Sequence, residues 1–155
     1  WQAADVVDED LPFRVRHITE YLAEELEAGN LKLGKVNGES YTFHDPCQLV
    51  RKGGIMDAPR QLMDAMDVEL KEMKNKKGFS FCCGGGGGVN DLESARKLRL
   101  RAQEMKLREI DETGAERFMT SCSDCRVAFA DAGEHHRWDK HTESLIEMVA
   151  ANIKE

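Results

Sequence analysis

The chain has 155 residues, and its 22 basic against 29 acidic side chains give a formal net charge of −7. This length suits a single domain with one core, and a hydrophobic content of 41% is sufficient to build that core. The acidic balance argues against a nucleic-acid partner, which would require a positively charged face. The longest apolar runs fall far short of the roughly 20 residues that a transmembrane helix needs, so no transmembrane segment is expected.

The beginning of the chain indicates a fragment of a longer protein. The first residue is Trp1, and residues 1–12 are acidic and weakly patterned. We therefore expect residues 1–155 to form one domain with an irregular N-terminal segment. No leader resembling a signal peptide is recognised, which predicts a cytoplasmic location, with the periphery of a membrane complex as the alternative.

Hydrophobic periodicity predicts that helices and strands alternate along the chain. The expected helices cover residues 13–28, 58–66, 90–112, 122–132 and 142–153. The expected strands cover residues 41–44, 68–73, 79–83 and 117–121, of which 68–73 is either an edge strand or an extended link. This order predicts an α/β fold, with a small parallel sheet of about three to four strands flanked by helices.

The longest expected helix has an N-cap at Asn90 or Asp91 and stops at Gly114. Helical spacing predicts one buried apolar face, formed by Leu92, Ala95, Leu98, Ala102, Met105 and Ile110. The basic residues of this helix are expected to form a solvated face: Arg96, Lys97, Arg99, Arg101, Lys106 and Arg108.

Five cysteines lie at or just beyond the ends of expected strands: Cys47, Cys82, Cys83, Cys122 and Cys125. Ligands of open parallel sheets bind beyond the carboxyl ends of the strands. We therefore expect all five sulfurs to share one pocket at that edge of the sheet.

Several kinds of chemistry suit these cysteines. A redox pair of the thioredoxin type at Cys122 and Cys125 would leave three cysteines idle. A structural zinc site usually takes two pairs of the Cys-x-x-Cys kind, which the adjacent Cys82 and Cys83 do not provide. Soft thiolates in a reducing compartment favour an iron–sulfur cluster, with zinc as the alternative and inert buried thiols as the least favoured interpretation.

Five consecutive glycines follow Cys83, and they match neither a phosphate-binding loop nor a dinucleotide fingerprint. Bare amide N–H groups can approach an anion closely, and a thiolate-ligated cluster is an anion. Gly84, Gly85 and Gly86 are therefore predicted to cradle the cofactor, the alternative being a flexible surface loop.

Three motifs together resemble the cysteine-rich CCG domain of the heterodisulfide reductase type, which also occurs in glycolate oxidase iron–sulfur subunits and lactate-utilisation proteins. They are His44-Asp45-Pro46-Cys47, Cys82-Cys83-Gly84 with its glycines, and Thr120-Ser121-Cys122 with Cys125, within residues 41–128. Ser123 departs from the family pattern, which commonly has proline in its Cys-Pro-x-Cys.

This resemblance implies a [4Fe-4S] cluster held by the five cysteines, non-cubane in heterodisulfide reductase, which transfers electrons or cleaves a disulfide. It also implies partners, namely other redox subunits or domains and a thiol or disulfide substrate. His44 is expected either to orient the first ligand or contact substrate, or to stabilise the turn together with Asp45. The remaining histidines are expected to lie at the surface: His17 in the first helix, and His135, His136 and His141 in a loop.

Overall fold

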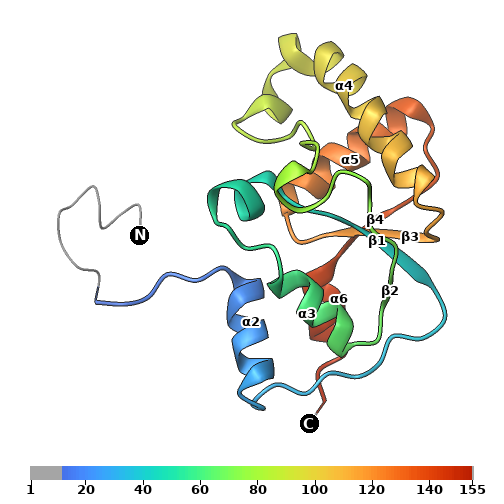
Figure 1. Cartoon of the computed structure of the whole chain (residues 1–155). Helices are drawn as coiled ribbons and strands as arrows, with labels where there is room; N and C mark the ends of the chain where they lie inside the picture. The colour runs from blue at the N-terminus through green and yellow to red at the C-terminus, as the bar shows by residue number, and fades with distance from the viewer. Residues whose placement is uncertain (1–11, 155) are drawn as a thin grey trace.

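The computed structural model describes residues 12–154, which form a four-stranded parallel sheet with helices on both faces (Figure 1). The strands are β1 (Ser40–His44), β2 (Glu69–Leu70), β3 (Arg117–Thr120) and β4 (Thr142–Ser144). Their order is β2-β1-β3-β4, and each neighbouring pair is parallel. The expected α/β fold is confirmed, while the irregular segment expected at residues 1–12 lies almost wholly outside the described residues.

Within residues 12–154, five α-helices and three short helical turns accompany the strands. The helices are α2 (Ile18–Glu27), α3 (Ala58–Ala65), α4 (Glu93–Glu112), α5 (Ser123–His136) and α6 (Leu145–Ala151). The short turns are η1 (Gln48–Lys52), η2 (Lys77–Phe79) and η3 (Val89–Asp91). No helix within residues 12–154 is long and apolar enough to cross a membrane.

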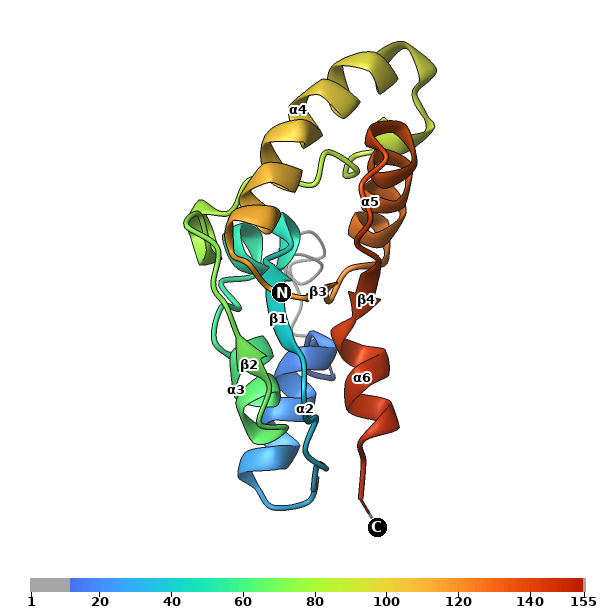
Figure 2. The ribbon, with the colours of Figure 1, turned by 90° about the vertical axis from the view of Figure 1, so that its right-hand side faces the viewer.

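Each face of the sheet has its own core, because side chains alternate along a strand. Tyr41 and Phe43 of β1 pack in a core with residues of α3 and α6. Phe118 of β3 instead packs with residues of α4 and α5, and the His44 ring meets Phe129 of α5 edge-on at 5.0 Å. Figures 1 and 2 accordingly show α4 and α5 on one side of the sheet, and α2, α3 and α6 on the other.

One expected boundary and one expected strand, both before the glycine run, are wrong. The first helix begins at Ile18 rather than at residue 13, because the His17 ring accepts the Thr19 N–H and the Glu20 side chain accepts the His17 N–H, which completes a capping box. The strand expected over 79–83 does not form. The Arg51 side chain donates hydrogen bonds to the carbonyls of Gly78 and Ser80. These bonds occupy carbonyl groups that would otherwise pair with a neighbouring β-strand.

The second half of the chain differs from expectation in three elements. Helix α4 begins at Glu93 with Leu92 as its N-cap, since Asn90 and Asp91 form the η3 turn. Helix α5 continues to His136, so His135 and His136 are helical rather than in a loop. The helix expected over 142–153 is β4 followed by the shorter α6.

Helix α4 buries a different face from the one that its apolar spacing predicts. Leu98 is 76% exposed and Met105 is 57% exposed. The buried face combines Leu100, Leu107 and Ile110 with the polar residues Arg99, Gln103, Lys106 and Glu109. The expectation that Arg99 and Lys106 belong to a solvated face is therefore wrong, because both lie against partners in the interior.

Candidate metal centre

Three separate segments bring the five cysteines together beside the carboxyl ends of β1 and β3. Cys47 follows β1 and precedes η1, while Cys122 is the N-cap of α5 and Cys125 lies in its first turn. Cys82 and Cys83 lie in the irregular segment between η2 and η3. The prediction that these two follow a strand end is wrong, although they still reach the same place.

The five sulfurs form a continuous series of neighbours. The Sγ atoms of Cys47 and Cys82 are 3.9 Å apart. Cys83 is in side-chain contact with Cys82 and with Cys125, and Cys125 is in turn in contact with Cys122. All five thiols are free of disulfides, and their exposure ranges from exposed Cys82 to Cys83, which is 2% exposed. This geometry agrees with the expected shared pocket, and the ligand role of the five cysteines stays a prediction.

The thiols differ strongly in acidity. Hydrogen bonds from Cys125 and Cys82 lower the pKa of Cys83, against burial, and the Gly85 N–H acts in the same direction. A hydrogen bond from Cys125 also lowers the pKa of Cys122 to about 6, with help from the backbone amides at the start of α5. The pKa of Cys125 is raised by its hydrogen bonds to Cys122 and Cys83 and by burial. These shifts favour the thiolate forms of Cys83 and Cys122.

His44 and Asp45 have different surroundings although they are adjacent. The His44 ring is buried beside the cysteines, and one of its nitrogens lies within 4.8 Å of the sulfurs of Cys83 and Cys125. Burial lowers the pKa of His44, which favours the neutral form of the imidazole. Asp45 instead accepts two N–H bonds from Arg60 at 2.9 Å and one from the Lys77 backbone at 2.7 Å. Asp45 stabilises the turn, whereas His44 faces the cysteines.

The glycines after Cys83 have distinct roles. The Gly84 N–H donates to the Cys82 sulfur at 3.3 Å, and the Gly85 N–H donates to the Cys83 sulfur at 3.5 Å. A Cβ at Gly85 would stand 2.9 Å from the Cβ of Ala128 in α5, so this loop lies directly on the helix. A Cβ at Gly86 would meet nothing within 4 Å. The predicted cradle thus has its clearest counterpart at Gly84 and Gly85.

A polar stripe on α4 supports the cysteine segment, and sequence reasoning missed it. The stripe consists of Arg99, Gln103, Lys106 and Glu109, all buried. Gln103 donates to the Cys83 carbonyl at 2.6 Å and to the Ala128 carbonyl at 3.0 Å, which joins α4, the cysteine segment and α5. The four polar residues share a helical face with Leu100 and Ile110, and that spacing is the signal that could have revealed them.

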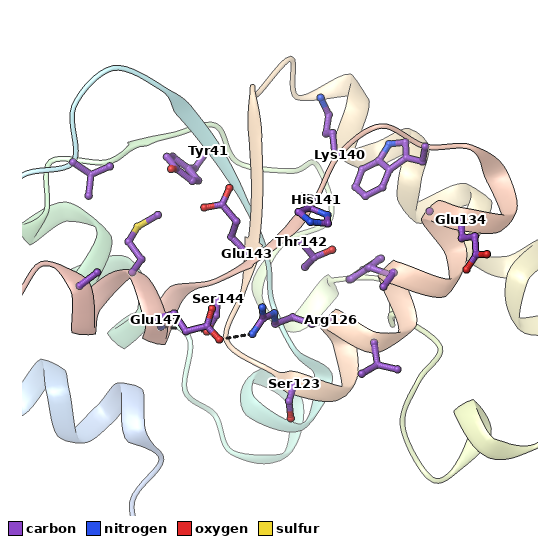
Figure 3. Close-up of a pocket in the computed structure, with 18 of the residues that line it drawn as sticks. Tyr41, Ser123, Arg126, Glu134, Lys140, His141, Thr142, Glu143, Ser144 and Glu147 are labelled. Carbon is purple, nitrogen blue, oxygen red and sulfur yellow. Dashed lines mark hydrogen bonds and ion pairs between the residues drawn. The ribbon is translucent and has the colours of Figure 1, made fainter.

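Two cavities lie near the cysteine-bearing elements. One of about 440 Å³ opens beside Cys122 and is lined by Leu49 and Ile55 on its apolar side and by Arg16 and His17 on its polar side. A larger cavity of about 890 Å³ runs along the edge strand β4 between α5 and α6, where Arg126 pairs with Glu147 at 2.6 Å (Figure 3). None of the five cysteines lines this larger cavity.

Fold and site define a class: parallel α/β domains that gather free thiols beyond the strand ends of one sheet. The model of a family of cysteine-rich domains, designated CCG, matches residues 41–130. The chain belongs to this family. The matched residues contain all five cysteines, the whole of β3, and β1 except for Ser40.

Several curated proteins are similar to the chain. One subunit of the dihydromethanophenazine:CoB–CoM heterodisulfide reductase of Methanosarcina barkeri is 34% identical over 146 residues, covering 94% of this chain and 35% of that protein. The EtfAB:quinone oxidoreductase of Syntrophomonas wolfei is 34% identical over 77% of this chain and 17% of its own length. A probable iron–sulfur-binding oxidoreductase of Bacillus subtilis, FadF, is 40% identical over 56% of this chain and 12% of its own length. The chain thus spans about a third or less of these relatives.

Proposed function

We propose that this chain is an iron–sulfur redox domain of a larger oxidoreductase related to heterodisulfide reductase. The observation that carries the proposal is the series of five free thiols, each next to at least one other, drawn from three segments. Relatives named as a heterodisulfide reductase subunit and as an iron–sulfur-binding oxidoreductase support it. The partners proposed are the other redox subunits or domains of such a complex. Free thiols favour a reducing compartment, so we place the domain in the cytoplasm or at the periphery of a membrane complex.

The donor set fits a [4Fe-4S] cluster, cubane or non-cubane. Cys47, Cys82, Cys83, Cys122 and Cys125 would hold it, and five sulfurs exceed by one the single protein ligand that each iron of a cubane requires. When bound, the cluster supplies one-electron transfer. The Gly84 and Gly85 amides already point at cysteine sulfurs, and such N–H bonds stabilise a negatively charged, sulfur-ligated group. Phe129 and Ala128, at 1% and 0% exposure, keep water from the inner side of the site.

A thiol or disulfide substrate would approach through the cavity beside Cys122. Its apolar side suits an alkyl chain, and the lining residue Arg16, which also pairs with Glu24, suits an anionic group. Complete reduction of a disulfide takes two electrons and two protons and releases two thiols. The electrons would come singly from the redox partners, and Cys122, one of the proposed ligands, lines this cavity.

A zinc-stabilised structural or interaction domain is the second candidate. It is favoured by one observation: His44, Cys83 and Cys125 place a nitrogen and two sulfurs within 4.8 Å of one another. Nitrogen and sulfur donors of this kind suit a tetrahedral zinc ion, with Cys122 as the fourth ligand. Zinc would also be the metal most readily taken up if an isolated chain lost an iron–sulfur cluster.

Metal analysis of the whole 155-residue chain separates the two candidates. After anaerobic reconstitution we expect about four irons and four sulfides per chain, together with visible charge-transfer absorbance and an EPR signal on reduction. Replacing Cys82, Cys83 or Cys122 by serine should cut the iron content sharply, because a hydroxyl is a poor ligand for a soft site. The control is Ser123→Ala, which alters an exposed residue between two cysteines. A colourless protein with stoichiometric zinc, or full iron in all three serine variants, would reject the iron–sulfur proposal.

A further inference from the structure

Lys106 is a buried cation on the polar stripe of α4. Its side chain is 1% exposed, and its Nζ donates to Glu109 at 2.9 Å and to the sulfur of Met73 at 2.9 Å. Glu109 accepts two further bonds from Asn75, from the backbone and side-chain nitrogens, at 2.7 Å each. The ion pair is therefore held in one orientation by partners on both sides.

The ammonium end of this pair contacts the core that contains two of the cysteines. Met73, which the ammonium contacts, packs in the same core as Cys83 and Cys125. Gln103, one turn earlier on α4, donates to the Cys83 carbonyl at 2.6 Å, so this helical face lies against the cysteine segment. Burial lowers the pKa of Lys106, and attraction by Glu109, Asp45 and Cys83 opposes that effect. The charge of Lys106 in turn adds to the burial that lowers the pKa of His44.

A charged lysine is a costly choice at this position. Burial of an ammonium is unfavourable even when it is paired, and apolar residues of similar volume often replace such pairs without loss of stability. Neither the fold nor the proposed donor set requires a cation here, because α4 already packs through Leu100, Leu107 and Ile110.

We propose that Lys106 is a tuning residue that raises the reduction potential of the cysteine-bound cluster. The inference rests on the proposed function. Reduction adds one negative charge to the group held by the cysteines, and a nearby buried cation stabilises the more negative state. The interior screens this attraction far less than water does, so an exposed lysine or arginine on the same helix has a much weaker effect. Glu109, the partner of the ammonium, carries the opposite charge and opposes its field.

The test compares four variants of the full chain by redox titration, followed by absorbance and EPR. Lys106→Met should change the equilibrium constant for one-electron reduction tenfold or more, which lowers the reduction potential by about 59 mV or more. Glu109→Gln should shift the potential in the opposite direction, because it removes the opposing charge. The double variant, Lys106→Met with Glu109→Gln, leaves no buried charge without its partner, so it provides a folded alternative if the single variant misfolds. Its reduction potential should also be lowered. Arg108→Met, whose side chain is 69% exposed, is the matched control and should leave the potential unchanged.

The outcomes separate this inference from the proposed function. Opposite shifts for Lys106→Met and Glu109→Gln at full iron content would support tuning, since a purely structural role predicts no such change of sign. A loaded wild type whose potential is the same in Lys106→Met, or in the double variant if the single one does not fold, would overturn the inference alone. A wild-type chain that takes up no iron would overturn the proposed function together with this inference.

Discussion

Gly85→Ala should destabilise the domain because the glycine loop lies directly on α5. The added methyl would stand 2.7 Å from the Asn90 Nδ2 and 2.9 Å from the Cβ of Ala128. The Asn90 side chain can rotate away, but Ala128 is fully buried on the helix, so the loop itself must shift. Overpacking of this kind costs about 1–3 kcal/mol. Since 1 kcal/mol corresponds to about 2–4 °C in a domain of this size, we expect a clear fall in Tm.

Gly86→Ala is the matched control for this prediction. Its added methyl meets nothing within 4 Å, and the backbone there lies outside the left-handed region. Replacing glycine by alanine reduces the conformational freedom of the unfolded chain. The free energy of unfolding should therefore stay unchanged or rise by up to ~1 kcal/mol. Both variants would be compared by thermal and urea unfolding of the whole chain.

A double variant tests the contact itself. Ala128→Gly removes the methyl that the new Cβ would meet, so Gly85→Ala should cost less in that background than in the wild type. The shifted loop also moves the Gly85 N–H away from the Cys83 sulfur, from its present 3.5 Å, so the single variant should retain less iron. Equal stability of the Gly85 and Gly86 variants, or strictly additive effects in the double variant, would refute the steric explanation.

Two further predictions concern groups around the cysteines. Asp45→Asn should reduce the free energy of unfolding by about 3 kcal/mol in urea titrations, because Arg60 would lose a buried charged partner and keep only Glu72; a loss below ~1 kcal/mol would contradict this. In the metal-free chain, alkylation of Cys122 followed by mass spectrometry should rise through pH 6 and level off near neutrality, because its lowered pKa of about 6 populates the thiolate there. A rate that keeps rising to about pH 8.5, as for an ordinary thiol, would contradict the assigned acidity.

The strands that carry a strong local pattern could be predicted from the sequence. Residues 41–44 and 117–121 are short β-prone runs followed by turn signals, and both form central strands of the sheet. The same pattern failed at residues 79–83. There the tertiary contacts from Arg51 and the close approach of Gly85 to α5 decide the backbone, and neither contact leaves a mark on local periodicity.

The cysteines could be identified from the sequence, but their supporting groups could not. Because free thiols are rare in proteins, five cysteines in three motifs indicate a single shared site. The polar stripe of α4 was missed because the apolar residues on the opposite face, such as Leu98 and Met105, also follow helical spacing. Their spacing therefore predicts that face as the buried one. Only the packing shows that α4 turns Gln103 toward the Cys83 carbonyl, where a polar partner is required.

The separation of the cysteines along the chain has a consequence for biosynthesis. Thirty-four residues separate Cys47 from Cys82, and 38 separate Cys83 from Cys122. The donor set is therefore incomplete on the ribosome until residue 125 has emerged and β3 has joined β1. A cofactor delivered earlier would find only a subset of thiols on an unfolded chain. Assembly of the proposed centre would therefore follow synthesis of most of the domain, and a cofactor bound to all three segments would close two long loops that no disulfide closes.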